Sequence, residues 1–230
     1  MADLSADNRR IWEERYRRRE AVLRYPFDSV VTFVFRKLRR PGAGGPARVL
    51  DFGCGAGNHL HFLVENGYEA YGVDVAPTAL ELAREHLADL RPGYPDDRLA
   101  LMDGNHIPFA EASFDAVIDR SGLGQNRAAD IRDLIGEIWR VLKPGGHYFG
   151  INFSDRHPDL RFGKPVGDGD YSDFSEGVFK EIGCRHFFGS GELRGLFANF
   201  VIDDIRLLTE ESVMGKGGSA QVIVEARKPQ

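Results

Sequence analysis

Apolar and polar positions in the middle of the chain follow two periods in turn, one typical of buried strands and one of amphipathic helices. Short apolar runs are each followed by a segment whose apolar residues recur every three or four positions. This alternation predicts βαβ units and a parallel sheet. Strands are expected at 47–52, 69–75, 98–102, 114–118 and 147–152, with helices at 58–66, about 77–90 and 129–142.

The segment before the first strand predicts two amphipathic helices, at 3–24 and 27–40. The stretch 41–46 is rich in proline and glycine, a composition typical of a linker. We therefore expect residues 1–46 to form an N-terminal helical cap, or lid, with its linker. The apolar faces of these two helices are also suited to a homodimer contact.

The core domain is expected to span 47–230, because the strand and helix patterns continue to the end of the chain. A helix is predicted near 190–198, and strands near 200–208 and 220–227. Residues 153–189 have the least regular pattern and many aromatic side chains, which predicts a variable insertion. Loops of this kind often carry function.

Composition narrows the function classes. A chain of 230 residues with net charge −5 is most simply one soluble domain, without the basic field that nucleic-acid binding favours. Its two cysteines, Cys54 and Cys184, predict a reducing compartment rather than a disulfide framework. His59, His61 and His86 lack convincing zinc spacing, so no metal is expected. With a charged start and no apolar run of membrane-spanning length, we expect a cytoplasmic protein without membrane contact.

The most informative stretch is a turn directly after the first strand. The apolar run 49–52 gives way to Gly53, Gly55 and Gly57 at alternate positions, and a helical pattern begins at about Asn58. Glycine lets the backbone adopt positive φ and approach a ligand closely. The helix N-terminus supplies free N–H groups. A ligand with carboxylate, phosphate or ribose groups is therefore expected over this turn.

Two protein families have a glycine-rich turn at this place in the fold. The dinucleotide fingerprint G-x-G-x-x-G requires a third glycine at position 58, where the chain has Asn58. The observed G-x-G-x-G, with Asp51 two residues before it, resembles motif I of the class I S-adenosylmethionine-dependent methyltransferases. A nicotinamide oxidoreductase is the less favoured alternative.

The ends of the next strands supply further candidates. Asp74 ends the second strand, 17 positions after Gly57, close to the spacing of a ribose-binding carboxylate. The alternative is an aspartate that caps the next helix. After the third strand, Asp103-Gly104-Asn105 leads to Pro108-Phe109 and later to Phe114-Asp115, which looks like the adenine-binding stretch of the methyltransferase family. By itself, an Asp-Gly pair would indicate only a turn.

The resemblance covers roughly residues 47–152, because Lys143-Pro144-Gly145-Gly146 is also similar to the family's helix-to-strand junction. It implies an α/β, Rossmann-like sheet of seven strands, mostly parallel with the last one antiparallel, and helices on both faces. It also implies S-adenosylmethionine as cofactor. The residues expected at the cofactor are Asp51, Gly53, Cys54, Gly55, Asn58, His59, Asp74, Val75, Asp103, Gly104, Asn105 and Asp119, with Trp12 and Tyr16 from the lid.

Trp12 and Tyr16 lie four positions apart and so share one helix face. Many small-molecule members of the family fold such a helix over the cofactor. The alternative is a solvated helix held by charge pairs four residues apart.

Two residues are candidates on the acceptor side. Arg120 follows the fourth strand and is suited to clamping an acidic substrate, or to pairing with Asp119 or Asp115. His186 has a side chain suited to proton transfer, although a histidine beside Phe187 and Phe188 is more often a packed strand residue.

The pattern favours methyl transfer to an oxygen or nitrogen atom of a small-molecule acceptor. No Asn-Pro-Pro-Tyr-like motif follows the fourth strand, which argues against methylation of nucleic-acid bases. The alternatives are a catalytically silent S-adenosylmethionine-binding partner protein and a methyltransferase that acts on a macromolecule.

Overall fold

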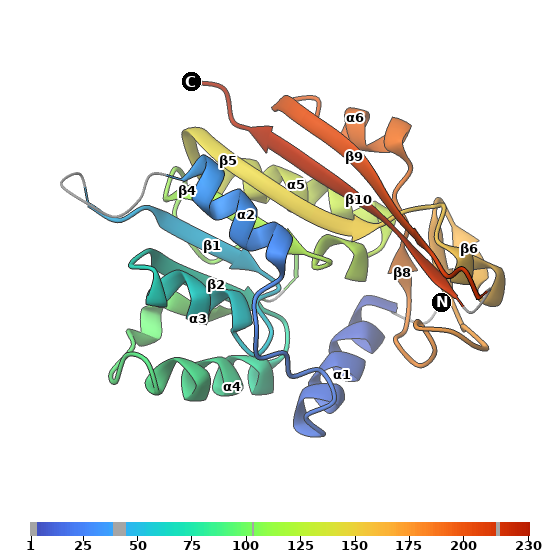
Figure 1. Ribbon diagram of the computed structural model, residues 1–230, viewed down its shortest axis with the longest axis horizontal. Helices are drawn as coiled ribbons and strands as arrows, with labels where there is room; N and C mark the ends of the chain where they lie inside the picture. Colours follow the sequence, from blue (N-terminus) through green and yellow to red (C-terminus); the bar gives the residue numbers. More distant parts are fainter. Residues whose placement is uncertain (1–3, 39–44, 103, 215–216) are drawn as a thin grey trace.

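The computed structural model describes residues 4–38, 45–102, 104–214 and 217–230. Its centre is a seven-stranded sheet in the order β3-β2-β1-β4-β5-β10-β9 (Figure 1). The bounds are β1 (Arg48–Phe52), β2 (Glu69–Asp74), β3 (Leu99–Leu101), β4 (Phe114–Arg120), β5 (Leu142–Phe153), β9 (Val201–Glu211) and β10 (Gly218–Arg227). Only β10 runs antiparallel to its neighbours β5 and β9, so the expected mostly parallel seven-stranded sheet is confirmed.

Helices cover both faces of the sheet, because the strands are apolar on both sides. One face packs against α2 (Asp28–Lys37), α3 (Asn58–Glu65) and α4 (Pro77–Ala88). The other packs against α5 (Ala128–Val141) and α6 (Ser190–Leu196). Neighbouring residues of β1 separate accordingly: Val49 joins the first layer, and Leu50 joins the second.

The N-terminal cap is smaller than the sequence suggests. Only α1 (Leu4–Arg17) lies away from the sheet, beside α4 (Figure 1). The assignment of α2 to the cap is wrong, because Val30, Phe33 and Val34 are buried in the core and Phe33 stacks on Phe149 at 4.5 Å. Much of the apolar face of each of these two helices is thus packed within the chain itself. The linker 41–46 lies mostly outside the described residues.

The junction before β5 differs from the turn expected there. Lys143–Gly146 belongs to β5, whose pairing with β4 shifts register between Phe114 and Ala116. Gly145 has φ of +75°, which lets the chain make this irregularity without steric cost.

The irregular segment 153–189 has a core of its own. It contains a small antiparallel sheet of β6 (Lys164–Gly167), β7 (Asp170–Ser172) and β8 (Arg185–His186). Phe174, Phe179 and Phe187 form its buried cluster. Within the described ranges, no helix has both the length and the apolar character to cross a membrane.

Candidate active site

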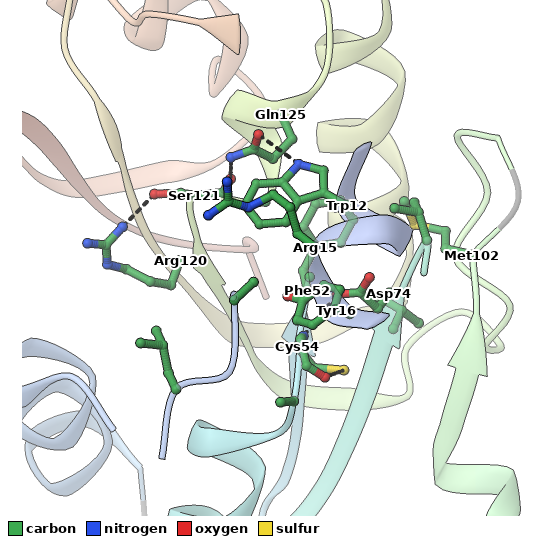
Figure 2. A pocket seen from close by; sticks show the side chains of 18 of the residues that line it. Trp12, Arg15, Tyr16, Phe52, Cys54, Asp74, Met102, Arg120, Ser121 and Gln125 are labelled. Atoms are coloured by element: carbon green, nitrogen blue, oxygen red, sulfur yellow. Dashed lines mark hydrogen bonds between the residues drawn. The ribbon is translucent and has the colours of Figure 1, made fainter. Parts of the chain in front are cut away.

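A cavity of about 350 Å³ lies at the carboxyl ends of β1, β2 and β4 (Figure 2). This is the edge at which the strand order reverses, since the chain runs outward from β1 to β3 and then returns to β4. Ligands of open α/β sheets bind at such a switch point. The volume lies within the range of about 300–1,000 Å³ that is usual for small-molecule sites.

The glycine turn forms one wall of the cavity. Gly53, Gly55 and Gly57 all have left-handed φ, of 73°, 53° and 83°. A Cβ at Gly55 would lie 2.6 Å from the hydroxyl oxygen of Tyr16. Only glycine therefore allows the α1 side chain to lie so close over this turn.

Asp74 lies where the sequence analysis expects it, in the wall of the cavity. One carboxylate oxygen accepts a hydrogen bond from Gly55 N and the other from Ala76 N, both at 2.9 Å. It thus fixes the glycine turn and also bonds the residue that precedes α4. Burial raises the pKa of Asp74 to about 6. A carboxylate has about four acceptor positions, so room remains for ligand hydroxyls.

Asp51 and His59 form a buried pair behind the turn, with His59 Nδ1 3.3 Å from an Asp51 oxygen. His59 also lines the cavity, and its Nε2 has no hydrogen-bond partner among the described residues. Asn58 donates to the Tyr25 carbonyl at 2.9 Å, which ties the start of α3 to the chain after α1. Cys54 is buried and lines the same wall.

The expected cofactor contact of Asp119 does not fit the structure. Its carboxylate is buried below the cavity and accepts hydrogen bonds from Tyr148 Oη, Asn152 Nδ2 and two backbone N–H groups, at 2.7–3.1 Å. Asp119 instead holds the turn after β4, in which Ser121 has a positive φ of 63°. A non-glycine residue in this conformation is uncommon and is often found at functional sites.

Helix α1 closes the cavity. Trp12 donates to the Gln125 side chain at 3.1 Å, as Figure 2 shows. Asn8 exchanges hydrogen bonds with the backbone of Cys184, at 2.6 and 2.9 Å. At the other side, Glu13 accepts from Thr78 N and Oγ1, at 3.1 and 2.7 Å. Tyr16 therefore lies at the glycine turn, and Trp12 lies in the cavity wall beside Gln125, while their contact with the cofactor stays a prediction.

Only some of the residues expected to contact the adenine ring lie in the cavity wall. Val75 and Met102 line the cavity, whereas Gly104 and Asn105 do not, and Asn105 donates to Asp130 at 3.0 Å. Asp103 lies outside the described residues. Its predicted contact with the adenine amino group therefore stays a prediction.

The proposed base role of His186 is not supported by its position. The side chain is fully buried between Asp170, at 2.8 Å, and Glu192, at 3.0 Å, and it does not line the cavity. Burial alone would lower the pKa of His186, but hydrogen bonds to these two carboxylates raise it to about 9. The imidazolium therefore joins β7 to α6, and it is a poor proton acceptor at neutral pH.

The cavity wall also contains residues that were not candidates in the sequence analysis, among them Arg15 and Arg185. Arg15 is hidden in a run of charged residues on α1. Arg185 stands in the apolar stretch 184–188, and a charge within such a run is the signal that could have found it.

These residues fit S-adenosylmethionine on structural grounds. Asp74 offers acceptors for ribose hydroxyls, and Val75 and Met102 offer apolar contact for a flat base. In the cavity wall, His59 Nε2 and Arg15 Nε are buried without hydrogen-bond partners in the described part of the chain. Both can donate to the carboxylate of the methionine end.

The fold and this arrangement define a Rossmann-like protein that binds a nucleoside-containing cofactor. Residues 49–146 match the family model described as a methyltransferase domain. A malonyl-[acyl-carrier protein] O-methyltransferase of Enterobacter lignolyticus is 36% identical over 116 residues, which cover 50% of this chain and 43% of that protein. The chain thus spans less than half of that relative's length.

Solved structures share most of the fold. A SAM-dependent methyltransferase from Methanosarcina mazei has a TM-score of 0.68 at 22% identity, covering 89% of this chain and 99% of the other. The 1,6-didemethyltoxoflavin-N1-methyltransferase of Burkholderia thailandensis, solved with bound S-adenosylhomocysteine, has a TM-score of 0.66 at 20% identity, over 96% and 87% of the two chains. Residues 49–146 thus match a methyltransferase domain, and the chain has the fold of the class I S-adenosylmethionine-dependent methyltransferases.

Proposed function

We propose that this protein transfers the methyl group of S-adenosylmethionine to an oxygen or nitrogen atom of a small-molecule acceptor. One observation carries the proposal: a single cavity holds both a cofactor wall, with the glycine turn and Asp74, and a second wall with Phe27, Arg120 and Phe153. Donor and acceptor can therefore meet inside the same enclosure.

The cofactor, when bound, supplies a methyl group that is already activated by its sulfonium. The chain's own contribution is to position the two reactants and exclude water. Tyr16 is 8% exposed and Trp12 is hydrogen-bonded to Gln125, so α1 covers the reacting centre. Fixed proximity and orientation can lower a barrier by about 7–11 kcal/mol.

A small acceptor is favoured over a macromolecule by the way the cavity is closed. Asn8 bonds to the backbone of Cys184 and Glu13 to Thr78, so α1 is fastened at both ends of the opening. A base in a nucleic-acid strand would need a groove that extends beyond the cavity. We propose an enzyme of small-molecule metabolism on this basis, and its cytoplasmic location stays a prediction from the sequence.

The test is methyl transfer from methyl-labelled S-adenosylmethionine to a panel of small hydroxyl and amine compounds, with RNA and protein fractions in parallel. We expect label in a small molecule, together with S-adenosylhomocysteine. Cofactor binding without turnover on any acceptor would favour the silent binding protein. Label in RNA or protein would favour the macromolecular alternative.

A further inference from the structure

The cavity has a charge that contrasts with that of the whole chain. The net charge of the protein is −5, yet the charged residues in the described cavity wall are Arg9, Arg15, Arg120 and Arg185 against one carboxylate, Asp74. Such a wall concentrates positive potential in a low-dielectric space and attracts anions.

Arg185 is the most unusual of these arginines. The residue is only 4% exposed, and its guanidinium lies over the rings of Phe153 and Phe179, at 5.2 and 5.1 Å. Its Nε has no hydrogen-bond partner, and no described carboxylate forms an ion pair with it. Burial, together with the nearby charges of Arg120 and Arg15, lowers the pKa of Arg185 to about 9. A buried charge without a counter-ion is costly, and a bound anion would relieve that cost.

Arg120 presents a second guanidinium to the same cavity. It lies 4.3 Å over the Phe27 ring, and Nη1 donates to Ser121 Oγ at 2.5 Å. No described carboxylate pairs with it either. In Figure 2, Arg120 lies well away from Asp74 and Met102, which mark the cofactor wall.

We propose that Arg185 and Arg120 bind an anionic group of the methyl acceptor, a carboxylate or a phosphate, whose apolar body packs against Phe27 and Phe153. This inference rests on the proposed function. Guanidinium groups bind both anions through paired hydrogen bonds. The cofactor has one carboxylate, to which His59, directly after the glycine turn, can donate from a buried Nε2 that has no hydrogen-bond partner among the described residues.

The experiment uses the full chain saturated with S-adenosylhomocysteine and titrated calorimetrically with benzoate, phenyl phosphate and the neutral benzyl alcohol. We expect at least one anion to bind at least tenfold more tightly than the alcohol. The preferred anion identifies the group, carboxylate or phosphate. Arg120→Gln and Arg185→Gln should each weaken anion binding about tenfold or more, while S-adenosylhomocysteine affinity stays within about twofold.

Two further variants control for folding and for charge in general. Arg185→Lys keeps the charge without the planar fork and should retain only part of the affinity. Arg161→Gln removes an exposed arginine that stacks on Phe162 outside the cavity, and should leave anion binding unchanged.

Equal binding of benzoate, phenyl phosphate and benzyl alcohol would overturn the inference. So would a loss of S-adenosylhomocysteine affinity in the Arg120 and Arg185 variants as large as their loss of anion affinity, because these arginines would then hold the cofactor carboxylate. Failure of the wild-type protein to bind S-adenosylhomocysteine is seen before any anion is added, and it overturns the proposed function instead.

Discussion

At the scale of single residues, Asp74 shows how one side chain serves structure and ligand together. Its two oxygens bind backbone N–H groups of the glycine turn and of the residue before α4. Burial nevertheless raises its pKa to about 6. In the free protein, Asp74 therefore binds a proton more readily than it does in the unfolded chain. The stability that this proton contributes is fully present below about pH 4 and is lost as the pH rises to about 6.

Cofactor binding should have the opposite pH dependence. Ribose hydroxyls donate hydrogen bonds and therefore favour the ionised carboxylate, so affinity should rise as the pH passes through about 6. We expect S-adenosylhomocysteine to bind about tenfold more weakly at pH 5 than at pH 8. Calorimetry at both values checks this. Asp74→Asn, which cannot ionise, should bind S-adenosylhomocysteine weakly and with an affinity that does not change between these pH values. If its affinity changes with pH as that of wild type does, another group is responsible for the pH dependence.

The titration of His186 should make the free energy of unfolding depend on pH. Because Asp170 and Glu192 raise its pKa to about 9, the stabilisation is complete below about pH 6.5 and is lost as the pH rises through 9. We expect a loss of up to about 3 kcal/mol between pH 6 and pH 10. Urea unfolding at several pH values measures it. His186→Gln should show a flatter profile than wild type, and parallel profiles would contradict the assignment.

At the scale of elements, α1 is the part of the fold that turns an open sheet edge into a closed site. It is fastened by a few polar contacts, among which Glu13 binds the N-terminal turn of α4 through Thr78. Its apolar contribution is small, with Tyr16 packed against Ala56, Ala76 and Ala79. Such an element is expected to open more easily than the sheet beneath it.

Removing the Glu13 contact should therefore loosen the lid. We expect Glu13→Ala to release S-adenosylhomocysteine about tenfold faster, because a hydrogen bond to a charged group contributes about 1.5–3 kcal/mol. Glu14→Ala is the matched control, since Glu14 pairs with Arg18 on the exposed side of the helix. Stopped-flow fluorescence of Trp12, in a Trp139→Phe background, measures the release. Equal rates in both variants would show that Glu13 does not fasten the lid.

At the scale of the whole molecule, α2 is joined to the far strands by charge as well as by packing. Glu225 on β10 is 3% exposed and binds Arg36 of α2 at 2.5 Å and Arg206 of β9 at 2.6 Å. One buried carboxylate thus connects the N-terminal part of the chain with its last two strands. Breaking a buried pair is costly when the remaining charges lose their partner.

We expect Glu225→Gln to lower the free energy of unfolding by about 2 kcal/mol, less than the about 3–5 kcal/mol for breaking a fully buried ion pair, because both arginines are half-exposed. Glu211→Gln, an exposed change on β9, should have almost no effect. Urea unfolding of the three proteins checks this. Equal stability of Glu225→Gln and wild type would contradict it.

The parts predictable from the sequence are those set by local pattern. Strand order follows from βαβ periodicity and the family resemblance, and the glycine turn identifies the end of β1 without any tertiary information. Asp74 could be placed because its spacing from the turn is nearly fixed. Trp12 and Tyr16 could be placed on one face because helical geometry determines it.

The remainder depends on partners distant in the chain. Asp119 and Asp74 both end strands, but Tyr148 and Asn152 of β5 bind Asp119 below the cavity. Asp170 and Glu192 keep His186 protonated, so it is a poor base, and no sequence periodicity connects these two residues to it. Such pairings are set by packing, so sequence pattern alone does not reveal them.

The most direct test of the account is calorimetric titration of the folded protein with S-adenosylhomocysteine, in wild type, Asp74→Ala and the exposed control Asp89→Ala. We predict clear binding by wild type and Asp89→Ala, and at least about 100-fold weaker binding by Asp74→Ala, since two hydrogen bonds to a charged acceptor are lost. Folded wild-type protein that does not bind, or an Asp74→Ala variant that binds as tightly as wild type, would contradict the assignment of this cavity as the cofactor site.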